Sequence, residues 1–195
     1  DTVLHFEFVT GTSVKEATAR EINTYDASNR PIQYVYQMWD AATLAFVNSQ
    51  KYNTVYDASG NIIEELSQAW DDVSKVWVNS NRRTHMYSSS NQDTLLIVQN
   101  WSTSTLAWVN NQKISVTLDA SDNPVKRLIM TWNITTGAWV NNFRNTSTFD
   151  ASKNITQYIN EIWSTASTTW VFSDRISNSF DASNRLIKRI GEHWN

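Results

Sequence analysis

Tryptophan and asparagine recur together in this chain, and their pairing could support carbohydrate binding. Flat indole rings stack on the apolar faces of sugar rings, and carboxamide groups hydrogen bond to sugar hydroxyls. The competing interpretation is structural, because a ring repeated in each unit packs on its neighbour's ring, and a buried aromatic side chain removes about 150–250 Å² from water. We favour the structural interpretation and keep as candidate ligand-binding residues Trp77, Trp108, Trp139, Trp170, Asn79, Asn110 and Asn141.

The residue types that perform catalysis show no pattern typical of an active site. His5, His85 and His193 fall at three different positions of the repeat, and the chain has no cysteine. No Ser-His-Asp order, zinc-protease motif, Gly-rich phosphate loop or dinucleotide motif is present. We therefore predict that the chain is not an enzyme and uses no cofactor.

A turn that recurs as Asp-x-Ser-x-Asn resembles the start of a calcium-binding loop. The bidentate acid expected at the twelfth position of such a loop is missing in two of three copies, where Gln68 and Met130 stand; the third copy has Glu161. A hydrogen-bonded turn explains the pattern, so we predict no metal site.

These residues belong to a strict repeat of 31 residues without insertions or deletions. Asp-Ala-Ser turns begin at Asp26, Asp57, Asp119, Asp150 and Asp181, and Ser88 fills the missing place. The first tryptophan series is Trp39, Trp70, Trp101, Trp132, Trp163 and Trp194, and Phe46 precedes the second series by one period. A fixed period in this range is typical of repeat architectures, in which each unit buries apolar surface against its neighbour.

Each unit reads as two antiparallel strands joined by a tight turn. The fourth turn position holds Asn29, Gly60, Asn91, Asp122, Lys153 or Asn184, and five of these six suit a left-handed backbone. Strict alternation along the outgoing arm places Trp108, Asn110 and Gln112 on one face. It places Lys113 and the equivalent basic residues on the other, exposed face.

The positions Gln37, Gln68, Gln99, Met130, Glu161 and Glu192 lie between an aliphatic residue and a tryptophan on one face. Side-chain amides at this spacing predict a ladder of hydrogen bonds between strands. We expect the ring-bearing face to be closed to water.

Composition excludes several classes of protein. The net charge of -3 argues against a nucleic-acid partner, and we expect no membrane insertion because no apolar run approaches ~20 residues. The first unit is degenerate, with Phe8 and Lys15 at the two tryptophan positions, as expected of a capping unit. The last copy stops after Trp194 and Asn195, which indicates that a longer parent chain continues.

Four turns read YDASNRPI, YDASGNII, FDASKNIT and FDASNRLI, and they resemble the YD (RHS) repeat. The full unit, with its paired-tryptophan hairpin, is similar to repeats in large secreted and cell-surface proteins of Bacteroidota, which the type IX system often exports. The resemblance implies an extracellular, antiparallel β array, with surface polysaccharide or secretion machinery as partners. YD repeats of toxins form a shell around a cargo.

We predict one all-β repeat domain over residues 1–195, an antiparallel meander of about six two-strand repeats in a curved or superhelical sheet. The alternative is a closed barrel of about twelve strands. Approximate repeat bounds are 1–26, 27–57, 58–88, 89–119, 120–150, 151–181 and a partial copy 182–195. The expected function is a structural or adhesive segment of a secreted or cell-surface protein. The alternatives are a glycan-binding module and, below it, part of a toxin-encasing shell.

Overall fold

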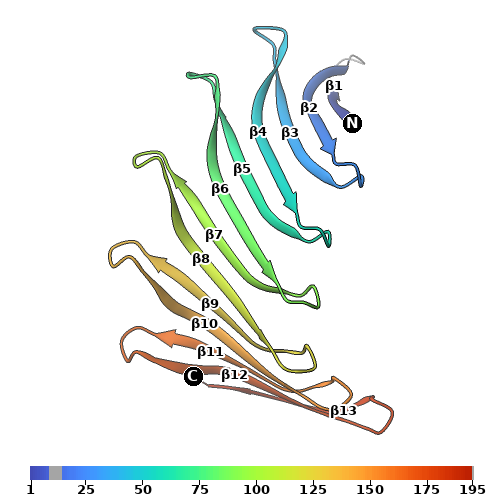
Figure 1. Cartoon of the computed structure of the whole chain (residues 1–195), viewed down its shortest axis with the longest axis vertical. Helices are drawn as coiled ribbons and strands as arrows, with labels where there is room; N and C mark the ends of the chain where they lie inside the picture. Colours follow the sequence, from blue (N-terminus) through green and yellow to red (C-terminus); the bar gives the residue numbers. More distant parts are fainter. Residues whose placement is uncertain (9–14, 195) are drawn as a thin grey trace. The chain divides into compact units, whose positions relative to one another are not determined.

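The computed structural model describes residues 1–8 and 15–194, and these ranges form thirteen β-strands and no helix (Figure 1). None of the described residues builds the long apolar helix that would cross a membrane. The strands are β1 (Thr2–Phe8), β2 (Lys15–Tyr25), β3 (Pro31–Asp40), β4 (Ala45–Tyr56), β5 (Ile62–Asp71), β6 (Val76–Tyr87), β7 (Asp93–Ser102), β8 (Ala107–Leu118), β9 (Pro124–Asn133), β10 (Ala138–Phe149), β11 (Ile155–Ser164), β12 (Thr169–Phe180) and β13 (Leu186–His193).

The strands form one antiparallel sheet whose order follows the sequence from β1 to β13. This confirms the predicted all-β meander. Within the described residues the order is linear and does not return from β13 to β1, so the sheet is open and the alternative of a closed barrel is wrong.

The chain forms two compact units. Unit 1 comprises Asp1–Thr84 and Gln99–Val109, and unit 2 comprises His85–Val98 and Asn110–Asn195. The single repeat domain over residues 1–195 stays a prediction. The side chains of Phe8 and Lys15, on which the degenerate first unit was predicted, and Asn195 lie outside the described residues.

The turns between outgoing and return arms are held by their aspartate, as predicted. Asp57 Oδ1 accepts the backbone N–H groups of Ser59 and Asn61, both at 2.9 Å. The Gly60 N–H donates to the Asp57 carbonyl at 3.1 Å, which closes the tight turn. The fourth turn position has positive φ in all six copies, namely Asn29, Gly60, Asn91, Asp122, Lys153 and Asn184.

The loops at the tryptophan end contain a second series of left-handed residues that the sequence did not suggest. Asp71 organises one of them, accepting the Val73 N–H at 2.9 Å and the Ser74 hydroxyl at 2.8 Å. The last residue of each loop has positive φ, although most of the residue types found at this position disfavour that conformation. These residues are Leu44, Lys75, Leu106, Gly137 and Thr168.

The hairpins β3–β4, β5–β6, β9–β10 and β11–β12 each contain a β-bulge that changes which side chains share a face. The register between β3 and β4 passes from Tyr36↔Gln50 to Gln37↔Asn48, so Ser49 has no partner. The equivalent unpaired residues in the other registers are Ser80, Asn142 and Ser173. Because an extra residue reverses the alternation, the basic residues lie on the same face as the tryptophans. The predicted placement of Lys113 and its equivalents on the opposite face is wrong.

The prediction that the ring face is closed to water is also wrong. Ala19 is the one buried hydrophobic residue among those described, and no large side chain there is fully buried. The tryptophans of β3 to β12 are half-buried, and Trp194 is 43% exposed. A single sheet has no second layer to cover either face, so shielding comes only from neighbouring side chains on the same face.

Candidate functional site

The tryptophans meet in pairs across each hairpin. Trp70 on β5 is the register partner of Trp77 on β6, and their ring centroids lie 5.1 Å apart with an interplanar angle of 68°. The same edge-to-face arrangement joins the rings of Trp101 and Trp108, Trp132 and Trp139, and Trp163 and Trp170, while Trp39 meets Phe46. Edge-to-face pairs contribute about 0.5–1.5 kcal/mol beyond their buried area. The repeated pair therefore stiffens each hairpin.

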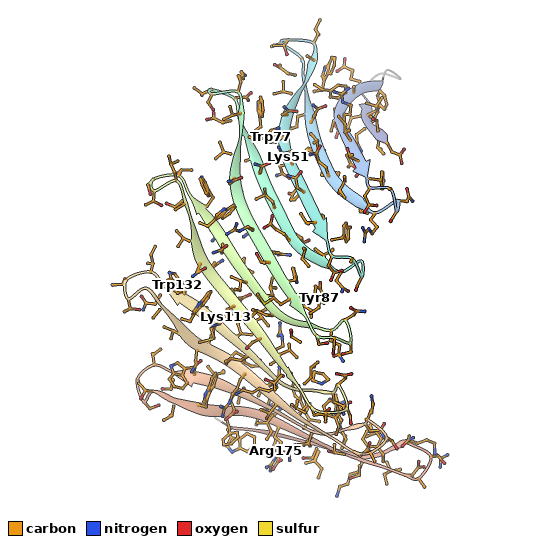
Figure 2. The ribbon with its side chains drawn as sticks, in the orientation of Figure 1. Lys51, Trp77, Tyr87, Lys113, Trp132 and Arg175 are labelled. Atoms are coloured by element: carbon orange, nitrogen blue, oxygen red, sulfur yellow. The ribbon has the colours of Figure 1, made fainter. Side chains whose placement is uncertain are left out.

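A cation from the preceding repeat lies over the second ring of each pair. Lys51 Nζ on β4 is 4.8 Å from the Trp77 ring centroid, and Figure 2 shows the two side chains side by side. The equivalent pairs are Arg20 with Phe46, Arg82 with Trp108, Lys113 with Trp139, and Arg144 with Trp170, at 4.6, 4.8, 5.2 and 4.5 Å. The indole π-face attracts the cation, so this contact links successive repeats.

Side-chain amides hydrogen bond across the tryptophan hairpins, which confirms the predicted ladder. Arg20 Nε donates to Gln37 Oε1 at 2.7 Å, and Gln37 Nε2 donates to Asn48 Oδ1 at 2.7 Å. Because arginine can only donate, it fixes which end of the Gln37 amide faces Asn48. In the next repeat Gln68 Nε2 donates to Asn79 Oδ1 at 2.9 Å.

The ladder changes its chemistry towards the end of the chain. Arg144 makes a bidentate ion pair with Glu161, whose side chain is only 7% exposed, and Phe172 stands where the earlier repeats have asparagine. A carboxylate accepts but cannot donate, so the residue beyond it receives no hydrogen bond. Arg175 pairs with Glu192 at 2.6 and 2.8 Å, and these hydrogen bonds lower the pKa of Glu192.

The candidate ligand residues from the sequence are largely engaged with the protein. Trp77, Trp108, Trp139 and Trp170 each have a cation over the ring and another indole against it. The side-chain oxygen of Asn79 accepts from Gln68, and Asn141 pairs through its backbone register with Met130, while Asn110 follows Trp108 by two residues on β8. Their proposed role in binding a ligand stays a prediction.

Neighbouring tryptophan hairpins enclose a recess that was not predicted from the sequence. In unit 1 a cavity of about 290 Å³ is lined by Trp39, Val47, Asn48, Ser49, Trp70 and Asp72, and we call it the Trp39–Trp70 notch. In unit 2 a second cavity of about 290 Å³, which we call the Trp163–Trp194 notch, is lined by residues that lie four repeat periods after those of the first notch. Phe172 stands there in place of Asn48. The recurrence of both tryptophans every 31 residues was the available signal.

No family model and no curated protein matches this sequence. The chain is similar to the crystal structure of a protein with unknown function from Bacteroides fragilis NCTC 9343, with a TM-score of 0.50 and 12% identity. That match covers 65% of this chain and 90% of the other, and at this identity it shows a similar fold alone.

Two further structures are less similar. A DUF3836 family protein from Bacteroides vulgatus ATCC 8482 matches with a TM-score of 0.38 and 19% identity over 48% of this chain and 90% of that one. The TcdB2-TccC3-Cdc42 structure matches with a TM-score of 0.32 and 10% identity over 98% of this chain and 14% of that one. Both scores are below 0.5, so neither similarity bears on fold or function.

The described residues contain no cluster of metal ligands. Within residues 1–8 and 15–194 no group of three or more His, Asp or Glu side chains is close enough to hold a metal ion. His85 Nδ1 lies 2.7 Å from Asp93 Oδ2, in a pair between β6 and β7.

Proposed function

We propose that this chain is a non-catalytic repeat segment that acts as a structural and adhesive part of a longer secreted or cell-surface protein. The observation that carries the proposal is the contact of Lys51 with Trp77, which recurs on the 31-residue period. In each case the basic side chain of one repeat contacts an aromatic ring of the next repeat. That is the arrangement expected of a scaffold whose stability grows by addition of repeats.

The length dependence of stability tests the structural role. Variants shortened by one and by two repeats from the C-terminal side should each lose free energy of unfolding in similar steps. Urea denaturation followed by tryptophan fluorescence measures these steps, and an unshortened chain is the reference. A free energy of unfolding that stays constant as repeats are removed would contradict the proposal.

The proposed location rests on the resemblance of the turns to YD repeats and of the whole unit to repeats of surface proteins. Antibodies against this chain should label intact cells of the source organism to the same extent as permeabilised cells. Labelling that requires permeabilisation would overturn the proposed location. A parent chain with further repeats and an export signal would be consistent with it.

Glycan binding is the second candidate function. The notches are better candidate sites for a sugar than the tryptophans of the second series. Trp77, Trp108, Trp139 and Trp170 already carry a cation over the ring, which competes with a stacked sugar. The Trp39–Trp70 notch, in contrast, is an open cavity next to two indoles and an amide. Adhesion and structural support are compatible roles for one sheet.

A further inference from the structure

We propose that the Trp39–Trp70 notch binds one pyranose residue of a neutral polysaccharide. The proposal deepens the adhesive part of the function proposed above. It assigns binding to a recess between hairpins and not to the cation-covered rings of the second tryptophan series.

The notch exists because neighbouring repeats stop pairing before the hairpins end. Strands β3 and β4 stay paired as far as Asp40↔Ala45, next to the hairpin loop. Strands β4 and β5, which belong to successive repeats, are paired only as far as Gln50↔Ala69. The tryptophan hairpins of unit 1 therefore project separately, as the β3–β4 and β5–β6 loops show in Figure 1.

The walls of the notch are aromatic and rigid. Trp39 is held by its edge contact with Phe46 at 5.0 Å, and Trp70 by its contact with Trp77 at 5.1 Å. Both indoles are half-buried, so part of each ring still meets solvent. Pre-positioned apolar walls with a few placed polar groups are typical of small-ligand sites, and ~300 Å³ is the lower end of their volume range.

The polar group of the notch has a fixed orientation. Arg20 donates to Gln37 Oε1, so the Gln37 amide must donate to Asn48 Oδ1. The Asn48 NH₂ group is thereby directed away from Gln37, and its two N–H bonds remain available as donors. Ligand hydroxyl oxygens accept such bonds, and Ser49 lines the same recess.

Two carboxylates at the rim select against acidic ligands. Asp40 and Asp72 both line the notch. The hydrogen bond from the Thr43 hydroxyl lowers the pKa of Asp40, so this group is charged at neutral pH. The carboxylate of Asp72 pairs with Lys75 at 3.1 Å on the exposed side. A sugar hydroxyl can donate to these groups. The ammonium of Lys75 balances only one of the two carboxylates, so the net negative charge of the rim disfavours a uronic acid or a sulfated sugar.

The Trp163–Trp194 notch provides a comparison within the same molecule. It keeps both indoles, but Phe172 replaces the amide and Ser164 replaces the carboxylate of Asp40. Its walls can contact an apolar surface but lack the amide donor of Asn48 and the carboxylate of Asp40. We therefore expect the two notches to differ in their response to the same sugar.

The test is a titration of the ¹⁵N-labelled full chain with cellohexaose, maltohexaose and hexagalacturonate, observed through indole and side-chain amide resonances. At least one neutral hexasaccharide should shift the Trp39, Trp70 and Asn48 signals saturably, with a Kd on the order of 1 mM. The signals of Trp163 should move less, and hexagalacturonate should bind more weakly. Absence of a saturable shift with both neutral probes, or stronger binding of hexagalacturonate, would overturn the proposal.

Two variants separate binding from stability. Asn48→Leu should weaken the neutral sugar about tenfold, the loss expected for one hydrogen bond. Asn48→Asp keeps the acceptor for Gln37 but removes the donors, so it should weaken binding while the melting temperature stays close to that of the parent. Unchanged affinity in both variants would refute the role of Asn48. If the parent chain does not bind sugar but its stability still grows with the number of repeats, the proposed binding site is rejected and the structural role is retained.

Discussion

Lys51 Nζ lies 4.8 Å from the ring centroid of Trp77, although the two residues are on strands that do not pair with each other. The bulge at Ser80 separates Asn79 from Asn81 in the register of β5 and β6. A corresponding bulge at Ser49 on β4 precedes Lys51 and turns it towards the ring face. Burial lowers the pKa of the Lys51 ammonium, which is consistent with its position against aromatic surface.

This contact predicts a measurable coupling energy. A double-mutant cycle with Lys51→Met and Trp77→Leu should give about 0.5–2 kcal/mol, the range of cation–π interactions from exposed to desolvated sites. Urea denaturation of the parent, both single variants and the double variant measures it. Coupling below about 0.3 kcal/mol, which is within additive behaviour, would show that the contact does not stabilise the sheet.

The ladder at Glu161 predicts compensation between two substitutions. Glu161→Gln should destabilise the chain by about 1–3 kcal/mol, because Arg144 loses a charged acceptor and a donor then faces Phe172. Adding Phe172→Asn recreates the relay found at Gln37 and Asn48, so the double variant should be more stable than Glu161→Gln alone. Thermal melts of the four proteins check this, and purely additive losses would argue against the relay.

The left-handed residue of the tryptophan loop predicts a stabilising substitution. Thr168 has a φ of 54°, a conformation that a β-branched side chain disfavours. Thr168→Gly should raise the free energy of unfolding by about 0.5–1.5 kcal/mol, since glycine adopts this backbone without strain. The matched control is Gly137→Thr, at the equivalent position with a φ of 62°, which should lower it by a similar amount. Equal stability of all three chains would indicate that the loop carries no strain.

The turn aspartates predict a loss of stability in acid. The hydrogen bonds from the side chain and backbone of Asn123 lower the pKa of Asp119 below its ordinary value of 3.8. As the pH falls through 3.8, the unfolded chain binds a proton before the folded chain does. The stability contributed by Asp119 is therefore complete above about pH 5 and is lost as the pH falls towards the lowered folded-state pKa.

Denaturation midpoints between pH 6 and pH 2 test this expectation. Asp119→Asn keeps an acceptor for the Ser121 and Asn123 backbone amides but no longer titrates, so its stability should fall less steeply in acid. Ser88→Asp, at the copy that naturally lacks the aspartate, should steepen the fall. Parallel curves for the parent and Asp119→Asn would show that this carboxylate does not contribute.

The features that reasoning from the residues predicted correctly are local or periodic. The turn at Asp57 needs only an acceptor at the first position and a tolerant backbone at the fourth, and both requirements are visible in the residue types. The amide contact between Gln37 and Asn48 recurs between Gln68 and Asn79 because each pair occupies the same two facing positions of its hairpin. The meander order of the strands follows from short connections between neighbouring arms.

The features that could not be predicted depend on atoms far apart in the chain. A one-residue bulge at Ser49 leaves no mark in composition, yet it moves every later side chain of β4 to the other face. Ring burial was overestimated because repetition implies contact between neighbours but not a second layer above them. The Trp39–Trp70 notch arises where the pairing of β4 with β5 ends, at Gln50↔Ala69.

The period of 31 residues in the sequence was therefore enough to establish about six two-strand repeats, their turns and their side-chain ladders in outline. The structure gives the count of thirteen strands. The placement of Lys51 on Trp77, the exposure of the rings and the recess beside Asn48 required the folded sheet. The physical reason is that hydrogen-bond register between strands is a collective property. A shift of one residue exchanges the two faces without changing any local preference.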